Sequence, residues 1–203
     1  MITIIDLELC NLGSVLNILK KVGAPARVLK SHNDLKTAQK IILPGVGSFD
    51  NAMKNLNESG LKELLIQRVR IDKVPILGIC LGMQLLTNGS EEGHESGLGF
   101  IDAQTIKFQS DTMKIPHMGW NGVTKKKSHV LIDNLEEDAR FYFVHSFYVK
   151  CVNSADTLTT TNYICEFDSA IQKDNVMGVQ FHPEKSHQFG MQLMKNFAEL
   201  ADA

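Results

Sequence analysis

Short apolar runs alternate with segments of helical periodicity along the first half of the chain. The strand-like runs predict four short strands, at residues 2–5, 26–29, 41–43 and 75–79. Between them, apolar residues recur every three or four positions, which predicts helices carrying Leu12, Val15, Leu16, Leu19 and Val22, and then Leu61, Leu64, Leu65 and Val69. Strands separated by helices favour a parallel sheet that is covered on both faces.

The second half of the chain is richer in predicted strands. "FYFVHSFYV" (141–149) is aromatic and β-branched, and "NVMGVQF" (175–181) is typical of another buried strand. A last helix is predicted from the apolar stripe Phe189, Leu193, Met194, Phe197 and Leu200. No internal repeat or linker interrupts the pattern, so we expect one α/β domain over residues 1–203.

Composition excludes several classes of function. Of the 203 residues, 43% are hydrophobic and 22% are charged, and the formal net charge is −2, which gives no electrostatic reason to bind nucleic acid or an anionic membrane. The N-terminus shows no secretory signal pattern, and no apolar run is long enough to span a bilayer. The four cysteines lack the spacing of a disulfide framework or a metal site, so we expect a reduced, cytoplasmic protein without a metal or cofactor.

The stretch "VPILGICLGMQLL" places Cys80 between Gly78 and Gly82, where a predicted strand gives way to a helix. This G-x-C-x-G pattern is the thiol version of the nucleophile elbow, whose sharp turn requires flanking residues without β-carbons. Such a turn exposes the thiol in a strained conformation, and the following helix N-terminus favours the thiolate. It also leaves the backbone N–H of Leu81 free to stabilise an oxyanion. The alternative is a buried, inert cysteine, as most free cysteines are.

A nucleophilic cysteine needs a base and a group that orients the base. "GVQFHPEKS" supplies His182 and Glu184, which share one face if the segment is extended, and Pro183 between them favours that extended form. His182 can then accept the proton of Cys80 while Glu184 selects the tautomer. A surface turn with a local ion pair is the alternative, and a metal site lacks evident further ligands.

A third glycine-containing motif, "PGVGSF" (44–49), follows another predicted strand. Its two glycines allow the backbone to approach a ligand closely and to present amides to it. The N–H of Val46 would be a second oxyanion donor. An ordinary strand-to-helix turn is equally compatible with the pattern.

Taken together, "GICLGMQ", "PGVG" and "FHPE" resemble the class I, triad-type glutamine amidotransferases, and the resemblance extends over essentially the whole chain. "PGVGSF", "SEEG", "PHMGWN" and "YFVHSFY" are typical of the glutaminase subunits of imidazole glycerol phosphate synthase and their close paralogues. The resemblance implies a flavodoxin-like fold, with an open, mostly parallel sheet and helices on both faces. It also implies Cys80 as nucleophile, His182 as acid and base, and Glu184 as the orienting group.

Carried onto matching positions, the resemblance implies a pocket for L-glutamine. Its lining residues would be Gly47, Leu81, Gln84, Glu92, His145, Ser146 and Phe147. The carboxylate of Glu92 suits the ammonium group of the substrate. Without the resemblance, a solvated residue in an acidic loop would be the simpler interpretation of Glu92.

The family also implies a partner, because ammonia must reach an acceptor before water protonates it. The expected partner is a (β/α)₈-barrel cyclase, which would form imidazole glycerol phosphate and AICAR in histidine biosynthesis. In the family the "HMGWN" motif lies near the subunit junction, so we expect an interface that includes Asn11, His117, Trp120 and Asn121. A lone tryptophan is otherwise more often a core residue.

Two departures from the histidine-pathway pattern keep other acceptors open. "DLELCNLGSV" has Leu7, Glu8 and Cys10 in place of a tyrosine and two glycines, and Phe147 stands where tyrosine is common. "HPEKSHQFGMQLMKNF" resembles paralogues that supply ammonia for amidination of a nucleotide-sugar in surface polysaccharide synthesis. From other classes of function, a stand-alone thiol hydrolase or peptidase and a non-catalytic docking module are the alternatives.

Overall fold

Five parallel strands form the centre of the molecule. The computed structural model describes residues 1–7 and 12–201, and within them the parallel strands follow the spatial order β2-β1-β3-β4-β12. Their bounds are Ile2–Ile4 (β1), Ala26–Val28 (β2), Lys40–Gly45 (β3), Ile76–Cys80 (β4) and Val176–Val179 (β12). This order is that of a flavodoxin-like sheet, and the predicted α/β fold class is confirmed.

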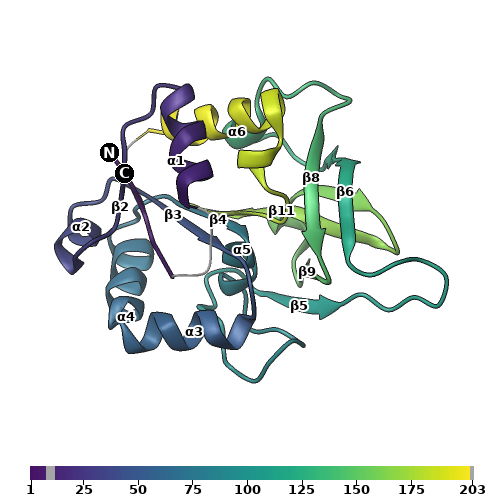
Figure 1. Ribbon diagram of the computed structural model, residues 1–203, viewed down its shortest axis with the longest axis horizontal. Helices are drawn as coiled ribbons and strands as arrows, with labels where there is room; N and C mark the ends of the chain where they lie inside the picture. Colours follow the sequence, from purple (N-terminus) through teal and green to yellow (C-terminus); the bar gives the residue numbers. More distant parts are fainter. Residues whose placement is uncertain (8–11, 202–203) are drawn as a thin grey trace.

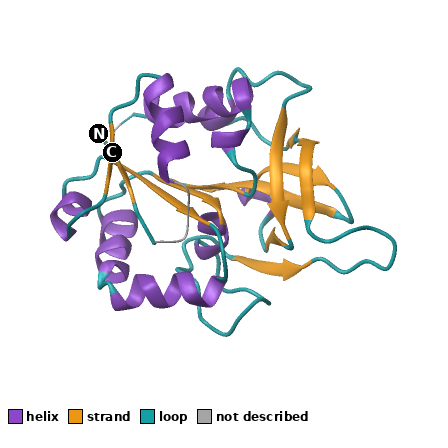
Figure 2. Cartoon of the chain, viewed as in Figure 1, coloured by secondary structure: helices purple, strands orange, loops and turns teal. Residues whose placement is uncertain are grey.

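Helices cover both faces of this sheet (Figures 1 and 2). On one face lie α1 (Leu12–Lys21) and α6 (His187–Glu199), and on the other lie α3 (Phe49–Glu58), α4 (Leu61–Ile66) and α5 (Leu81–Leu85). The helix predicted over Leu61–Val69 continues past α4 as a π-helical turn, Gln67–Ile71. The predicted stop at Gly23 is also observed, since α1 ends at Lys21 and Gly23 has a φ of +74°.

Antiparallel strands extend the sheet beyond β12. They are β11 (Glu166–Lys173), β10 (Thr157–Asn162) and β7 (Thr124–Lys125), with β9 (Phe147–Cys151) pairing β11 and β5 (Ala103–Lys107). The 3₁₀ turns are Val130–Ile132, Ser154–Asp156 and Pro183–Lys185. The sheet is therefore mixed, and its parallel half combines four strands from the first 80 residues with β12 from near the C-terminus.

One aromatic segment differs from its prediction. Residues 141–149 form two strands rather than one, because the chain changes sheets at Ser146. β8 (Arg140–His145) pairs with β6 (His117–Gly122) in a separate two-stranded sheet, whereas β9 joins the large sheet. The bend at Ser146 consequently brings backbone from the small sheet to the edge of the large one.

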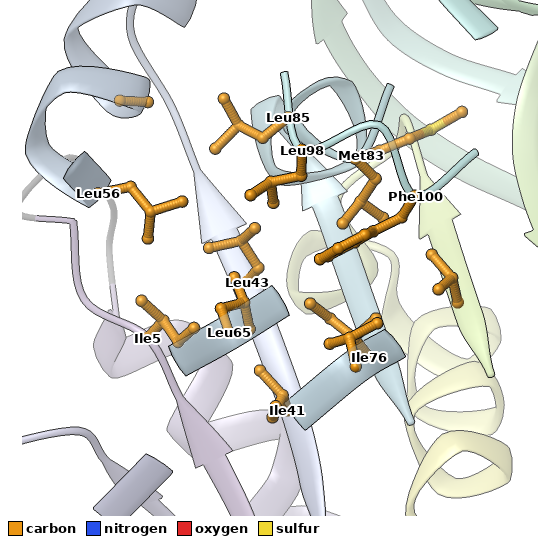
Figure 3. Packing of buried hydrophobic residues seen from close by; sticks show 14 of the residues in the cluster. Ile5, Ile41, Leu43, Leu56, Leu65, Ile76, Met83, Leu85, Leu98 and Phe100 are labelled. Carbon is orange, nitrogen blue, oxygen red and sulfur yellow. The ribbon is translucent and has the colours of Figure 1, made fainter. Parts of the chain in front are cut away.

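Alternation along the buried strands divides the core into two layers. On β3, Ile41 and Leu43 face α3 and α4, whereas Ile42 faces α1 and α6. Figure 3 shows the first layer, in which Leu56 and Leu65 approach the strand residues from the helices. Because both faces of these strands are buried, their sequences are nearly continuous apolar runs and do not alternate between apolar and polar residues.

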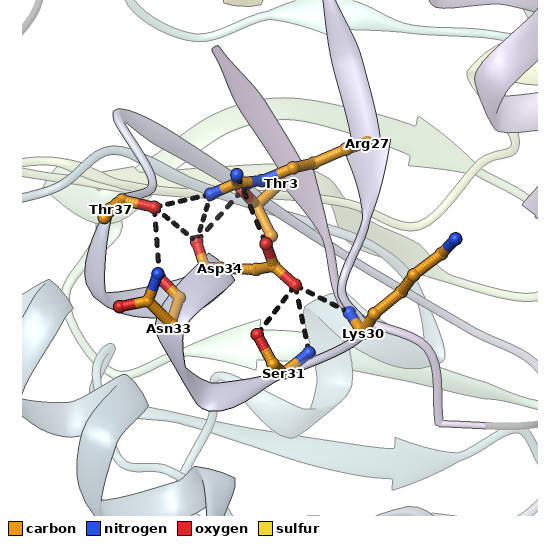
Figure 4. A network of polar contacts seen from close by, with 7 residues as sticks. All are labelled: Thr3, Arg27, Lys30, Ser31, Asn33, Asp34 and Thr37. Atoms are coloured by element: carbon orange, nitrogen blue, oxygen red, sulfur yellow. Dashed lines mark hydrogen bonds and ion pairs between the residues drawn. The ribbon is translucent and has the colours of Figure 1, made fainter.

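A polar network fixes the short helix α2 (His32–Lys36) beside the sheet edge (Figure 4). Asp34 accepts hydrogen bonds from the backbone N–H groups of Lys30 and Ser31, and its Oδ1 lies 3.2 Å from Nη1 of Arg27. These contacts, the Lys30 N–H first, lower the pKa of the Asp34 carboxyl. Across the described ranges, no helix has both the length and the apolar character needed to cross a membrane.

Candidate active site

The three sequence motifs meet at the carboxyl edge of the parallel sheet. Gly45 at the end of β3 lies opposite Cys80 at the end of the neighbouring strand β4. His182 follows β12, the next strand on the other side of β4. Because parallel strands end at one edge, segments separated by more than a hundred residues come together there.

Cys80 adopts the strained backbone expected of a nucleophile elbow, with φ 55° and ψ −110°. Both flanking glycines are required by close approach. A β-carbon on Gly82 would lie 1.7 Å from the carbonyl oxygen of Leu43, and one on Gly78 would lie 2.6 Å from the backbone of Gly82. The turn therefore packs the start of α5 directly onto β3 and β4, with no room for side chains between them.

His182 and Glu184 contact each other, but not through an extended segment. His182 is extended, whereas Pro183–Lys185 forms a 3₁₀ turn, so the prediction of extended backbone at Glu184 is wrong. Proline is favourable as the first residue of such a turn, where its missing N–H is not needed. The turn brings Oε1 of Glu184 to 2.7 Å from Nδ1 of His182, and both side chains are buried.

The imidazole of His182 is held between the carboxylate and the thiol. Burial alone would lower the pKa of His182, but hydrogen bonding and charge attraction from Cys80 and Glu184 outweigh it and raise this pKa to about 10. Nε2 is buried, and within the described residues it has no partner in strict hydrogen-bond geometry. The Cys80 sulfur is nevertheless close enough to contribute to the raised pKa, so Nε2 is the nitrogen available to the thiol.

A cavity of about 330 Å³ opens beside these groups. It collects Cys80, His182 and every residue that the sequence suggested for the pocket or the oxyanion site: Val46, Gly47, Leu81, Gln84, Glu92, His145, Ser146 and Phe147. Pro116 and Val144 also line it and were not predicted. Their approach depends on how the β6–β8 sheet folds over the elbow, which no local motif encodes. Glu184 does not line this cavity and reaches it only through His182.

The acidic residue of the pocket is anchored to the glycine loop. Oε2 of Glu92 accepts a hydrogen bond of 2.8 Å from the backbone N–H of Phe49, the first residue of α3. The loop that carries Glu92 is further tied to α3 by Asp50, which accepts from the N–H groups of His94 and Glu95. Gly47 has a φ of +99°, a conformation that favours glycine. Val46 beside it is 41% exposed.

Two buried histidines connect the pocket to strand β6. Nδ1 of His145 donates to the carbonyl oxygen of Phe147 at 2.7 Å, so Nε2 of the neutral ring accepts from Nδ1 of His117 at 2.9 Å. Nε2 of His117 in turn accepts from the side-chain amide of Asn121. Burial lowers the pKa of His117 to about 4 and that of His145 to about 3, which keeps both rings neutral.

Of the three described residues expected at a partner interface, His117, Trp120 and Asn121, Trp120 has an exposed side chain, at 44%. Its indole stacks on the imidazole of His187, with ring centroids 5.2 Å apart and an interplanar angle of 3°. Asn121 is half-buried, and the His117 side chain lies inside the fold. Asn11 and the substituted positions Glu8 and Cys10 lie outside the described residues.

Two functional candidates were missed in the sequence. Gln180 is fully buried and its Nε2 donates to Sγ of Cys80 at 3.7 Å. The sequence feature that could have identified Gln180 is a single amide side chain within the otherwise apolar run that follows Asn175. Ser186 is also buried, and its hydroxyl donates to the carbonyl of His182 and accepts from the N–H of Tyr142, which fixes the turn after the histidine.

A larger cavity, of about 880 Å³, lies at the opposite end of β4 and β12 and is lined by none of the candidate catalytic residues. Its polar lining includes Lys73, Asp174 and Asn196. Cavity size alone does not locate the chemistry here, because the strained thiol and the perturbed histidine are both at the smaller cavity. Over residues 1–7 and 12–201, no group of three His, Cys, Asp or Glu side chains is placed to hold a metal ion.

Comparison with known proteins agrees with this geometry. The family model described as "Glutamine amidotransferase class-I" matches residues 3–200. The chain is 55% identical to "Imidazole glycerol phosphate synthase subunit HisH 2" of Methanococcus maripaludis, covering 99% of this chain and 100% of that one. It is 50% identical to the protein of the same name from Pseudomonas aeruginosa, covering 98% and 100%.

Solved structures support the same fold at low sequence identity. A structure titled "Crystal structure of glutamine amidotransferase" superposes with a TM-score of 0.75 at 17% identity, covering 98% of this chain and 97% of that one. "Structure of PurLQS from Thermotoga maritima" gives the same TM-score at 15% identity, covering 97% and 96%. From the family match and the identity to these relatives, the chain belongs to the class I glutamine amidotransferase family.

Proposed function

We propose that the protein is the glutaminase subunit of a two-protein synthase, that residues 1–203 form its single glutaminase domain, and that it hydrolyses L-glutamine to glutamate and ammonia. The observation that carries this proposal is the convergence of Cys80, His182 and Glu184 beside a cavity lined by the residues that the family pattern assigns to glutamine. The cavity volume, about 330 Å³, suits a free amino acid better than a peptide.

In the proposed mechanism the Cys80 thiolate attacks the carboxamide carbon of glutamine, and the carbonyl oxygen becomes an oxyanion. The amides of Leu81 and Val46 stabilise this oxyanion. Protonated His182 then gives its proton to the departing nitrogen, and the C–N bond breaks to leave ammonia and a γ-glutamyl thioester. His182 next deprotonates a water molecule, which attacks the thioester, and the C–S bond breaks to release glutamate and restore the thiolate.

The remaining pocket residues bind and orient the substrate in this proposal. Gly47, Gln84, His145, Ser146 and Phe147 surround it, and Glu92 binds its ammonium group. Because Oε2 of Glu92 accepts from the N–H of Phe49, we assign the ammonium to Oε1. Glu184 acts on the reaction only through the imidazole.

Ammonia would pass to a partner subunit, proposed to be a (β/α)₈-barrel cyclase that forms imidazole glycerol phosphate and AICAR in histidine biosynthesis. The names of the relatives at 55% and 50% identity, which describe subunits of imidazole glycerol phosphate synthase, support this assignment. The exposure of Trp120 on β6 supports docking of the partner at this strand. A nucleophilic thiol requires a reducing environment, so we place the protein in the cytoplasm.

A second acceptor is favoured by a specific observation in the sequence. Leu7, Glu8 and Cys10 replace residues typical of histidine-pathway subunits, and the segment after Glu184 resembles paralogues that serve amidination of a nucleotide-sugar. This candidate retains the same glutaminase chemistry and differs only in the partner. A stand-alone thiol peptidase fits less well, since the cavity is small and its lining includes Gln84 and the carboxylate of Glu92, which suit a free amino acid.

The test combines the protein with each candidate partner. The subunit alone should release little glutamate, and release should rise when the liganded partner is added. Cys80→Ala should abolish glutamine-dependent synthesis while leaving synthesis from added ammonia intact. Full glutamine-dependent activity in Cys80→Ala, or substantial peptidase turnover without a partner, would contradict the proposal. The barrel protein that accepts the nitrogen identifies the pathway.

A further inference from the structure

Gln180 lies between the end of β12 and the catalytic imidazole, yet it is absent from the cavity lining. Its side chain is fully buried and forms hydrogen bonds with both the nucleophile, Cys80, and the pocket residue Gln84. A buried amide carries a desolvation cost unless every polar atom has a partner. The partners that it has are therefore informative.

The orientation of the Gln180 amide is determined by a chain of donors and acceptors. The carbonyl oxygen of Phe147 can only accept, so the atom of Gln84 that lies 3.3 Å from it is the donor Nε2. The same Nε2 lies 3.1 Å from Gln180 and gives its second hydrogen to Oε1 there. With Oε1 occupied in this way, Gln180 turns its own Nε2 toward Sγ of Cys80, at 3.7 Å.

This direction matters because a thiolate is a better acceptor than a neutral thiol. A hydrogen bond donated to the charged form of a group favours that form. The thioester sulfur carries no charge, so the hydrogen bond from Gln180 weakens when Cys80 is acylated. It strengthens again when hydrolysis of the thioester regenerates the Cys80 thiolate. The helix that follows Cys80 has only five residues, so a donor from the side chain supplies what its N-terminus provides weakly.

We propose that Gln180 is a positioning residue for the nucleophile: its amide, locked by Gln84, holds the Cys80 sulfur at the cavity as a thiolate. The inference rests on the proposed glutaminase reaction and adds to it a group outside the triad. Gln180 touches neither the cavity nor the departing nitrogen, and acts only through the sulfur.

Two substitutions test the proposal in the full-length protein. Gln180→Met keeps an unbranched side chain of similar length and removes the donor, and Gln180→Glu keeps the shape but places an acceptor against the sulfur. The measurement is the pH dependence of alkylation of Cys80 by iodoacetamide, followed by mass spectrometry of the peptide that contains Cys80. The rate reports the thiolate fraction. We expect the apparent pKa of the thiol to rise from wild type to Gln180→Met and again to Gln180→Glu.

In assays with the partner, the Gln180 substitutions should change kcat and KM for glutamine to different extents. A rise of one pKa unit lowers the thiolate fraction about tenfold at a pH below the pKa. We therefore expect kcat for glutamine to fall about tenfold or more, while KM stays within about threefold. Should Gln180→Met fail to fold, Gln180→Asn, which draws the amide back by one methylene group, gives the same test.

Ser169→Ala is the matched control. Ser169 is fully buried on the next strand, and its hydroxyl pairs with Thr159 rather than with Cys80. It should lower stability without changing the alkylation profile. An unchanged profile in both Gln180→Met and Gln180→Glu would overturn the inference while leaving the glutaminase proposal intact. Retained glutamine hydrolysis in Cys80→Ala would instead overturn the glutaminase proposal.

Discussion

Nδ1 of His182 lies 2.7 Å from Oε1 of Glu184, two residues further along the chain. A carboxylate only accepts, so this contact assigns the hydrogen to Nδ1 and directs Nε2 toward Cys80. The pairing is local, whereas the contact with Cys80 joins segments that lie about half the chain apart. The site therefore needs the fold to bring the thiol to the imidazole, but not to orient the imidazole.

Glu184→Gln should lower kcat for glutamine by about 10³- to 10⁴-fold, the size of effect seen when a triad loses its orienting carboxylate. The amide is nearly isosteric, but it can donate to Nδ1 and thereby select the wrong tautomer. KM should change little, because Glu184 does not line the cavity. Steady-state kinetics with the partner measure both constants. A loss below tenfold would show that the carboxylate does not set the tautomer.

The raised pKa of His182 predicts a pH dependence of stability. The folded protein retains a proton that the unfolded chain releases between the ordinary pKa of 6.5 and about 10. This contribution is complete below pH 6.5 and is lost as pH rises through 10. Melting temperatures of the wild type should fall over this window, and those of Glu184→Gln should fall less. Parallel curves for the two proteins would contradict the assignment.

The parallel half of the fold was predictable because four of its strands, β1, β3, β4 and β12, are buried on both faces and form short, mainly apolar runs. Two other elements show the limits. Helix α3 was not predicted, although its buried residues recur at helical spacing: Phe49, Ala52, Met53 and Leu56. The glycine loop directly before it is compatible both with a binding loop and with an ordinary strand-to-helix turn, so the loop pattern alone does not mark the start of a helix. Strand β10 is buried yet rich in threonine. The hydroxyl groups of Thr157 and Thr159 pair with Asp168 and Ser169 on β11, contacts that no local pattern shows.

The same distinction applies to the site. Cys80, His182 and Glu184 belong to short motifs with a chemical meaning, so they could be proposed from sequence. Gln180, Ser186 and the His117–His145 pair contribute through contacts with residues distant in the chain. The contact of Gln180 with Cys80 arises because β12 lies beside β4, whereas the contacts of Ser186 with Tyr142 and of His117 with His145 depend on the β6–β8 sheet.

Gly82→Ala should destabilise the protein by about 3 kcal/mol or more, because its β-carbon would meet backbone that cannot move without separating α5 from β3. Gly122→Ala is the control, since a β-carbon there meets no atom within 4 Å. Its effect should stay within about 0.5 kcal/mol. Denaturant unfolding measures both. Equal, small effects would show that the elbow is less tightly packed than this close approach requires.

His117→Phe should destabilise the protein at neutral pH by about 1–3 kcal/mol, because it leaves Nε2 of His145 buried without its donor. The aromatic ring keeps the stacking on Phe143 and Tyr163. The measurement is denaturant unfolding at neutral pH.

The same variant carries a pH signature. The folded pKa of His117, about 4, lies below its ordinary value, so its contribution is present above pH 6.5 and is lost as pH falls toward 4. The difference in stability between wild type and His117→Phe should therefore narrow on acidification. A stability difference that widens on acidification would mean that the His117 imidazole is protonated in the folded protein.

Trp120→Ala should weaken association with the partner more than it weakens the isolated subunit. The indole is 44% exposed and stacks on His187, so its removal uncovers little core. An exposed aromatic side chain of this kind has the character of an interface hot spot, whose truncation costs about 2 kcal/mol or more of binding. Titration calorimetry with the partner should show the loss, while the melting temperature of the free subunit changes by only a few degrees. An unchanged affinity together with a collapsed melting temperature would assign Trp120 to the stability of the β6–β8 sheet instead.

Met118→Ala tests the same face of β6, because the Met118 side chain is 63% exposed two residues before Trp120 on the same strand. A loss of affinity for the partner without a loss of stability would extend the interface along β6.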